Sequence, residues 1–213
     1  MAGRPAMVMR WYENGNASEY LLRKNPFADR VSLVSENTMR WILDVARGLE
    51  YLHTLSPPIV HGDLKGNNVI ITDEGRAALC DFGLSKVIED MGRPSGYTLT
   101  QPDVGPLRWQ APEFLEHEDT PLLPSSDIWS FGCTAYELLT GNIPYHHRTR
   151  DWTVIKDVQN GIKPPGPSGI ILPGLETRMI DILDDCWCFS PEERPTMTEV
   201  VEQIQQICNS SSF

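Results

Sequence analysis

Four polar side chains lie close together along one stretch of the sequence: Asp63, Lys65, Asn68 and Asp81. An aspartate can orient a hydroxyl group and accept its proton, and a lysine two positions on can face the same way along an extended loop. Amide and carboxylate oxygens are the ligands that a hard cation such as Mg²⁺ prefers. A base, a cation and two metal ligands are the groups that phosphoryl transfer to a hydroxyl requires.

The residues between Asn68 and Asp81 predict a hairpin that brings these two candidate metal ligands to one edge. Residues 69–71 and 77–80 are strand-like, and residues 73–75 (Asp-Glu-Gly) between them are typical of a turn. We therefore expect the side chains at the two ends of the hairpin to converge. The alternative interpretation is a surface loop with scattered polar residues.

Three short motifs follow one another along the chain: His61-Gly62-Asp63, Asp81-Phe82-Gly83 and Ala111-Pro112-Glu113. In this order they resemble the catalytic loop, the magnesium-binding turn and the end of the activation segment of a eukaryotic protein kinase. The resemblance covers nearly the whole chain, and what it matches is the larger, C-terminal lobe of such a kinase. It implies ATP and Mg²⁺ as cofactors and a protein as the substrate.

The resemblance also implies roles for individual residues. Asp63 would be the catalytic aspartate and Lys65 would meet the γ-phosphate, while Asn68 and Asp81 would hold the metal ion. Structural or regulatory roles would fall to His61, Phe82, Gly83, Asp127, Glu113 and Arg194.

The resemblance specifies two of these structural roles. Asp127 would accept backbone N–H groups of the catalytic loop near His61, although an aspartate at a helix start is also favoured by the helix dipole, and both can hold. Glu113 would pair with Arg194 and pin the substrate-docking loop. If that pair is buried, breaking it from one side would cost about 3–5 kcal/mol.

The first residues resemble the last strand of a kinase N-lobe followed by the hinge. By this resemblance Met9 would be the gatekeeper behind the adenine of ATP, and backbone groups of Arg10 and Tyr12 would bind its edge. Ile70 would form the floor beneath the adenine. The alternative interpretation is an irregular N-terminal tail.

The same resemblance divides the chain into the last N-lobe strand and hinge (1–16), a C-lobe (17–208) and a tail (209–213). The chain contains no glycine-rich loop, no strand lysine and no partner glutamate of an N-lobe. We therefore expect it to be inactive alone, either as a fragment of a full kinase or as a truncated relative with another role. The apolar cleft around Ile70 would then be uncovered and would bind a partner protein or a second copy.

Two departures from the common kinase pattern refine the group. Gly62 stands where an arginine usually pairs with an activation-loop phosphate, so the usual phosphate switch lacks its receptor. Pro106 and Trp109 resemble the residues that tyrosine kinases carry at the matching positions, whereas Lys65 resembles the residue that serine/threonine kinases carry. This mixture is typical of the tyrosine-kinase-like group, so we expect transfer to serine or threonine, with tyrosine left open. The alternative function is a pseudokinase or docking module that binds a partner without catalysis.

Composition favours an intracellular, cytoplasmic enzyme. The net charge is −11 without a lysine or arginine cluster, which disfavours nucleic acid as a partner. No apolar run approaches the ~20 residues that a membrane helix needs, so no membrane partner is expected. Five cysteines in mostly apolar surroundings indicate a reducing compartment rather than a disulfide framework.

Apolar residues at helical spacing predict a mainly α domain, within an α+β family fold, in which helices surround the small hairpin that carries the catalytic and magnesium loops. Ser35 would cap the first helix, Ser125 or Ser126 would open the second, and Gly141 would end it. The five predicted helical segments are 35–53, 125–141, 151–161, 179–187 and 200–207.

Overall fold

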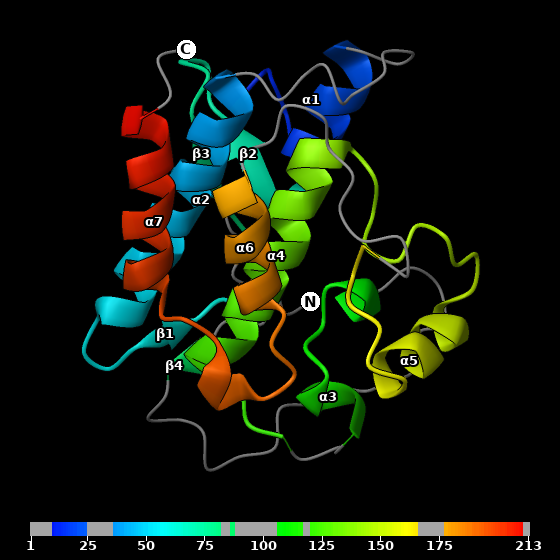
Figure 1. The fold of residues 1–213 in the computed structure, drawn as a ribbon. Helices are drawn as coiled ribbons and strands as arrows, with labels where there is room; N and C mark the ends of the chain where they lie inside the picture. Colours follow the sequence, from blue (N-terminus) through cyan, green and yellow to red (C-terminus); the bar gives the residue numbers. More distant parts are fainter. Residues whose placement is uncertain are drawn as a thin grey trace, which may run out of the picture.

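The computed structural model describes residues 10–24, 36–81, 86–87, 106–116, 120–165 and 177–210, and helices make up most of them (Figure 1). The α-helices are α1 (Ala17–Lys24), α2 (Glu36–Thr54), α3 (Glu113–Glu116), α4 (Pro124–Thr140), α5 (Asp151–Gln159), α6 (Thr177–Cys186) and α7 (Met197–Ser210). The strands are β1 (Ile59–Val60), β2 (Val69–Ile71), β3 (Ala77–Leu79) and β4 (Lys86–Val87), with 3₁₀ turns η2 (Gly66–Asn68), η4 (Pro106–Arg108) and η5 (Pro191–Glu193).

Helix α4 forms the centre of the helical bundle. Between Ser126 and Leu139 every residue of α4 except Ser130 is buried, which is why its sequence is apolar on all sides rather than on one stripe. Helices α2 and α6 pack against α4, and α7 packs across α2 and α6 (Figure 1). Trp129 and Phe131 of α4 are among the largest fully buried side chains of this core.

The predicted hairpin is present. Strands β2 and β3 pair antiparallel with Val69 opposite Leu79, and the chain turns at Gly75, where φ is 76°. A glycine takes this left-handed conformation without steric cost. Trp41 of α2 donates from Nε1 to the Gly75 carbonyl at 2.8 Å, so the hairpin is fixed to the bundle by a buried indole as well as by packing.

The N-terminal segment pairs with strand β2 of this hairpin as a third extended segment. The Ile71 N–H donates to the Gly15 carbonyl at 2.9 Å, and Asn16 forms an antiparallel bridge with Ile70. Asn16 then starts α1, because its Oδ1 accepts the N–H of Glu19 at 2.9 Å. The segment that we compared with a kinase hinge therefore runs beside the strand that carries the expected adenine floor.

A second small sheet joins the catalytic loop to a distant segment. Strands β1 and β4 pair antiparallel, with Ile59 opposite Val87 and Val60 opposite Lys86. The sequence analysis did not predict this pair, because two-residue strands carry too little pattern to be recognised. Its consequence is that the chain just before His61 is tied to the chain that follows the Asp81 motif.

The predicted helices are all present, with corrections at their ends. Helix α4 begins at Pro124 rather than at a serine cap: Leu123 is the N-cap, and proline suits the first turn because that turn needs no N–H donor. The Ser126 hydroxyl donates to Glu113 instead of capping the helix. The prediction for Gly141 is confirmed, since its φ is 64° and its N–H binds the Glu137 carbonyl.

The fold class is therefore the predicted one, mainly helical with a small hairpin. Several sequence predictions fall outside the residues that the structure describes: Ser35, Met9 with the strand before it, Phe82 and Gly83. Within the described residues, no helix combines the length and the apolar character that crossing a membrane would demand.

Candidate active site

Asp63, Lys65 and Asn68 form one hydrogen-bonded cluster. The Lys65 ammonium lies 2.9 Å from both carboxylate oxygens of Asp63, and Asn68 Nδ2 donates to Asp63 Oδ2 at 2.9 Å. Turn η2 makes this possible, because the Asn68 N–H binds the Lys65 carbonyl at 2.8 Å and folds the chain back on itself. The Asp63 side chain keeps 15% of its surface exposed and Lys65 keeps 25%, so a substrate can reach both.

His61 joins this cluster to the end of the hairpin. Its imidazole is fully buried, with Nδ1 accepting the Asp63 N–H at 3.3 Å and Nε2 lying 3.2 Å from the Cys80 carbonyl oxygen. A carbonyl can only accept, so Nε2 carries the proton and Nδ1 is the acceptor. The ring therefore fixes the distance between the catalytic loop and the residue before Asp81.

Asp127, in the first turn of α4, holds the backbone that precedes Asp63. Its Oδ2 accepts the His61 N–H at 2.7 Å and its Oδ1 accepts the Gly62 N–H at 2.9 Å. His53, at the end of α2, lies 2.9 Å from the same Oδ2 through its Nε2. The carboxylate is 1% exposed, and these donors compensate the cost of removing it from water.

The hairpin brings Asn68 and Asp81 to the same edge, as the spacing predicted. The Cys80 N–H donates to the Asn68 carbonyl at 3.0 Å, so Asp81 follows directly on a paired residue. Asp81 is exposed and has φ of 59°, a left-handed conformation that is uncommon outside glycine and that recurs at functional sites.

The donor set at this edge suits Mg²⁺ bound together with a phosphate ligand. The Asn68 amide nitrogen is engaged with Asp63, which leaves Oδ1 as the atom that would meet a metal ion beside the Asp81 carboxylate. In the part of the chain that the structure describes, no group of three or more His, Cys, Asp or Glu side chains gathers. Mg²⁺ is commonly held by one or two carboxylates plus phosphates and water rather than by a protein cage, so the two ligands fit it.

The predicted hinge residues lie at the edge of this region. Arg10 is exposed, pairs with Asp73 of the hairpin turn at 3.2 Å and stacks over the Tyr12 ring at 5.0 Å. Met9 lies outside the described residues. Ile70 is half-buried, and the backbone of Gly15 and Asn16 pairs with β2, the strand that carries it.

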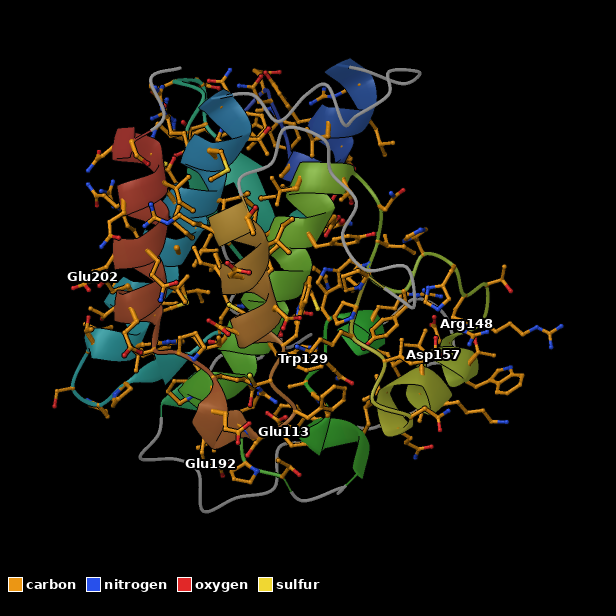
Figure 2. All side chains as sticks on the ribbon, viewed as in Figure 1. Glu113, Trp129, Arg148, Asp157, Glu192 and Glu202 are labelled. Atoms are coloured by element: carbon orange, nitrogen blue, oxygen red, sulfur yellow. The ribbon has the colours of Figure 1, made fainter. Side chains whose placement is uncertain are left out.

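Glu113 and Arg194 meet in a two-pronged ion pair between the start of α3 and the chain before α7. The two N–O distances are 2.9 and 2.7 Å, and the arginine side chain is fully buried. Its guanidinium also donates to the Ser125 carbonyl at 2.9 Å and lies 5.3 Å from the Trp129 ring. Figure 2 shows Glu113 and Trp129 near each other at one end of α4.

The sequence analysis missed Arg108, which anchors the candidate substrate loop, residues 106–110 before the Ala111-Pro112-Glu113 motif. Its guanidinium is almost entirely buried and donates to Asp151 Oδ1 at 2.9 Å and to the carbonyls of Tyr145 and Arg148 at 3.0 and 2.9 Å. Each nitrogen of the guanidinium therefore has a hydrogen-bond partner inside the protein, and these bonds connect turn η4 to the start of α5. No feature of the sequence could indicate this, because the partners are mostly backbone carbonyls.

Glu137 of α4 was missed as well. It is 5% exposed and contacts the catalytic loop and the substrate loop, and burial raises the pKa of its carboxyl group above the ordinary value. The signal was present in the sequence: a lone glutamate stands among apolar residues on a helix that is buried all round.

The comparisons with known proteins agree with this geometry. The family model described as protein tyrosine and serine/threonine kinase matches residues 1–204. The chain therefore belongs to the protein tyrosine and serine/threonine kinase family.

Individual relatives place the chain within that family. The chain is 29% identical over 200 residues to the serine/threonine/tyrosine-protein kinase HT1 of Arabidopsis thaliana, covering 94% of this chain and 46% of the relative. It is 34% identical over 168 residues to the serine/threonine-protein kinase TNNI3K of Mus musculus, covering 78% and 19%. A fibroblast growth factor receptor of Strongylocentrotus purpuratus is 29% identical over 99% of this chain and 21% of the relative. The chain thus spans less than half the length of these relatives, and its likeness to the first two agrees with the tyrosine-kinase-like group.

Proposed function

We propose that this chain carries the catalytic and metal-binding side of an ATP-dependent protein kinase. The observation that carries the proposal is the cluster in which Lys65 and Asn68 both bind the Asp63 carboxylate. A carboxylate without the lysine and the amide would support many reactions. The three together, beside Asp81, supply a proton acceptor, a phosphate-binding cation and metal ligands within one loop.

In this proposal each side chain has one task. Asp63 orients the substrate hydroxyl and accepts its proton, and Lys65 neutralises charge on the transferred phosphoryl group. Asn68 Oδ1 and the Asp81 carboxylate would hold Mg²⁺, which neutralises charge on the phosphates of ATP when bound. His61 and Asp127 touch none of the reacting atoms, and they position the loop that does.

The adenine of ATP would lie against the hinge segment. The pairing of Asn16 with Ile70 supports this, because it sets the chain after Tyr12 beside the proposed floor. Backbone groups of Arg10 and Tyr12 would bind the adenine edge, with Met9 behind it.

Serine and threonine are the proposed acceptors, and tyrosine is the alternative. Lys65 supports the first, since a lysine two residues after the catalytic aspartate resembles serine/threonine kinases. Relatives named as serine/threonine kinases and as serine/threonine/tyrosine kinases are both similar to this chain. Phosphoamino-acid analysis of the labelled product distinguishes the acceptors.

The test is transfer of radiolabelled phosphate from ATP to a generic protein substrate by the full-length protein, meaning the complete natural product that contains residues 1–213. We expect transfer that disappears in Asp63→Asn and in Asp81→Asn, through loss of the base and of a metal ligand respectively. Glu202→Gln on the outer side of α7 is the matched control (Figure 2). Near-normal transfer in either aspartate variant would overturn the assignment.

A finer proposal concerns the 213 residues on their own. They include no glycine-rich loop and no strand lysine, so nucleotide positioning would be incomplete. We expect this stretch alone to transfer no more phosphate than its Asp63→Asn variant. Clear transfer above that blank would contradict this part and leave the kinase assignment intact.

The second candidate function is a docking module that binds a partner protein or a second copy. Exposed apolar side chains near the hinge favour it: Trp11 is 79% exposed and Leu22 of α1 is 55% exposed. Light scattering of the 213-residue chain, compared with Trp11→Ser and Ile70→Asp, tests it. Association that either substitution removes would support docking at this face, and a monomer at about tens of micromolar would exclude a second copy as the occupant.

We also propose an intracellular location. None of the five cysteines forms a disulfide, and Cys133 and Cys186 are fully buried, as suits a protein that does not rely on disulfides. Fractionation of cells that express a tagged full-length protein tests this.

A further inference from the structure

Glu137 is a buried carboxylate that the proposed chemistry does not use. It lies on the central helix α4, yet each of its oxygens is occupied by a group from another part of the chain. Oε2 accepts the Gly66 N–H of the catalytic loop at 3.0 Å and the Trp109 indole N–H of the substrate loop at 3.2 Å. Oε1 accepts the hydroxyl of Ser18, on α1, at 2.6 Å.

These contacts join three segments whose relative positions must be fixed for the proposed reaction. Gly66 lies directly after Lys65, and Trp109 follows the buried anchor Arg108. Ser18 is in the first turn of α1, which continues from the segment paired with the adenine floor. One side chain therefore connects the nucleotide side, the catalytic loop and the substrate loop.

The fit around Glu137 is tight enough to require glycine at position 66. A Cβ atom built on Gly66 would overlap both Ser18 Oγ and Glu137 Oε1. Alanine there would displace the Ser18 or Glu137 side chain, although the backbone of Gly66 is not left-handed. The glycine is thus explained by close approach rather than by conformation.

We infer that Glu137 is a positioning residue for the phosphoryl-transfer site, holding the catalytic loop and the substrate loop at a fixed separation through its hydrogen bonds. This inference rests on the proposed kinase function. Trp109 and Gly66 share one oxygen, so the loop that presents the protein substrate cannot shift relative to Lys65 without breaking a buried hydrogen bond. A buried donor or acceptor that loses its hydrogen-bond partner costs free energy, because it no longer has water to bind instead.

The hydrogen bonds, rather than the charge, carry this role. Two of the three donors are fixed N–H groups, whereas the Ser18 hydroxyl can either donate or accept. A glutamine can therefore present its oxygen to Gly66 and Trp109 and donate from its amide to Ser18. Glu137→Gln should keep the arrangement, and Glu137→Ala should lose it.

The first experiment measures amide hydrogen exchange of Gly66 in the 213-residue chain. We expect faster exchange in Glu137→Ala, and protection close to wild type in Glu137→Gln and in the exposed control Glu202→Gln. This readout needs no catalysis, so it tests the hydrogen bonds even if the proposed function is wrong. Unchanged protection in Glu137→Ala would overturn the inference.

The second experiment measures steady-state kinetics of the full-length protein with ATP and a protein substrate. We expect Glu137→Ala to lower kcat/KM for the protein substrate by about 100-fold, since small misplacements near the chemistry cost that much, with little change in the KM for ATP. Glu137→Gln should stay near wild type. Equal losses in both variants, or a wild-type kcat/KM in Glu137→Ala, would refute the positioning role, whereas an inactive wild type refutes the proposed function instead.

Trp109→Phe provides a milder variant in case Glu137→Ala does not fold. It keeps an aromatic ring at this position but replaces the indole and removes its N–H donor, so we expect a higher KM for the protein substrate and an unchanged KM for ATP. Combined with Glu137→Ala, where that variant folds, it should add little further loss, because both changes break the same bond. An unchanged KM for the protein substrate in Trp109→Phe would also overturn the inference.

Discussion

The carboxylate of Glu113 and the guanidinium of Arg194 form a two-pronged ion pair across residues that are far apart in the sequence, with N–O distances of 2.9 and 2.7 Å. The arginine side chain is fully buried and the glutamate keeps 15% of its side chain exposed. The pair ties the start of α3, where the substrate loop ends, to the chain that enters α7. Its loss should therefore affect stability first.

Glu113→Ala should lower the free energy of unfolding by about 3–5 kcal/mol, because it leaves a buried guanidinium without its counter-charge. Urea unfolding followed by circular dichroism measures this. Glu192→Ala is the matched control, since that glutamate is exposed on the nearby turn η5 (Figure 2), and its effect should stay within about 0.5 kcal/mol. Similar values for the two variants would show that the buried pair contributes little.

Asp157 of α5 should make stability depend on pH. The Arg148 guanidinium, with N–O distances of 2.7 and 2.6 Å, lowers the pKa of Asp157 below its ordinary value, and His147 assists (Figure 2). A carboxyl group whose pKa is lower in the folded state adds stability above its unfolded pKa of about 3.9. That stability is lost as the pH falls through the folded value.

Asp157→Asn should consequently be less stable than wild type at pH 7, by about 2 kcal/mol for hydrogen bonds to a charged group, and the difference should shrink as the pH falls below about 4. Urea unfolding at several pH values measures it. The exposed Asp181→Asn on α6 should show no such convergence. A constant difference between wild type and Asp157→Asn at every pH would contradict the explanation.

Two helical glycines should respond in opposite ways to alanine. A Cβ on Gly132 would lie 2.7 Å from the Trp187 indole nitrogen, a rigid neighbour, whereas a Cβ on Gly48 would lie 2.9 Å from the flexible end of Leu79. Overpacking lowers the free energy of unfolding by about 1–3 kcal/mol, whereas the higher helix propensity of alanine raises it by about 1 kcal/mol. Thermal unfolding should therefore show Gly132→Ala destabilised and Gly48→Ala neutral or stabilised, and the reverse order would refute the packing argument.

Activation should not depend on a phosphate held by the catalytic loop, because Gly62 has no side chain to pair with one. The candidate modified positions are Ser95, Tyr97, Thr98 and Thr100, outside the described residues. Replacing the serine and threonines by alanine and the tyrosine by phenylalanine should leave transfer by the full-length protein largely intact. A collapse in rate that acidic substitutions restore would contradict this prediction.

Local pattern was sufficient for much of the fold. The strand-like residues 69–71 and 77–80 and the turn between them predicted the hairpin, and the helical spacing of apolar residues predicted five helices. Asp63, Lys65 and Asn68 were predicted to act together because they lie within one short loop, where sequence separation nearly fixes spatial separation. The family was predicted for the same reason, since its motifs are local.

Apart from the Glu113–Arg194 and Asp127–His61 contacts that the family resemblance implied, only the tertiary structure decided which distant groups meet. The three donors on Glu137 come from α1, the catalytic loop and the substrate loop, and the partners of Arg108 are mainly backbone carbonyls, which every residue carries. The structure likewise showed that α4 starts at Pro124 and that Ser126 binds Glu113 rather than capping the helix. A sequence determines which groups are available, but burial and long-range packing determine which of them must pair, because only groups removed from water need a partner.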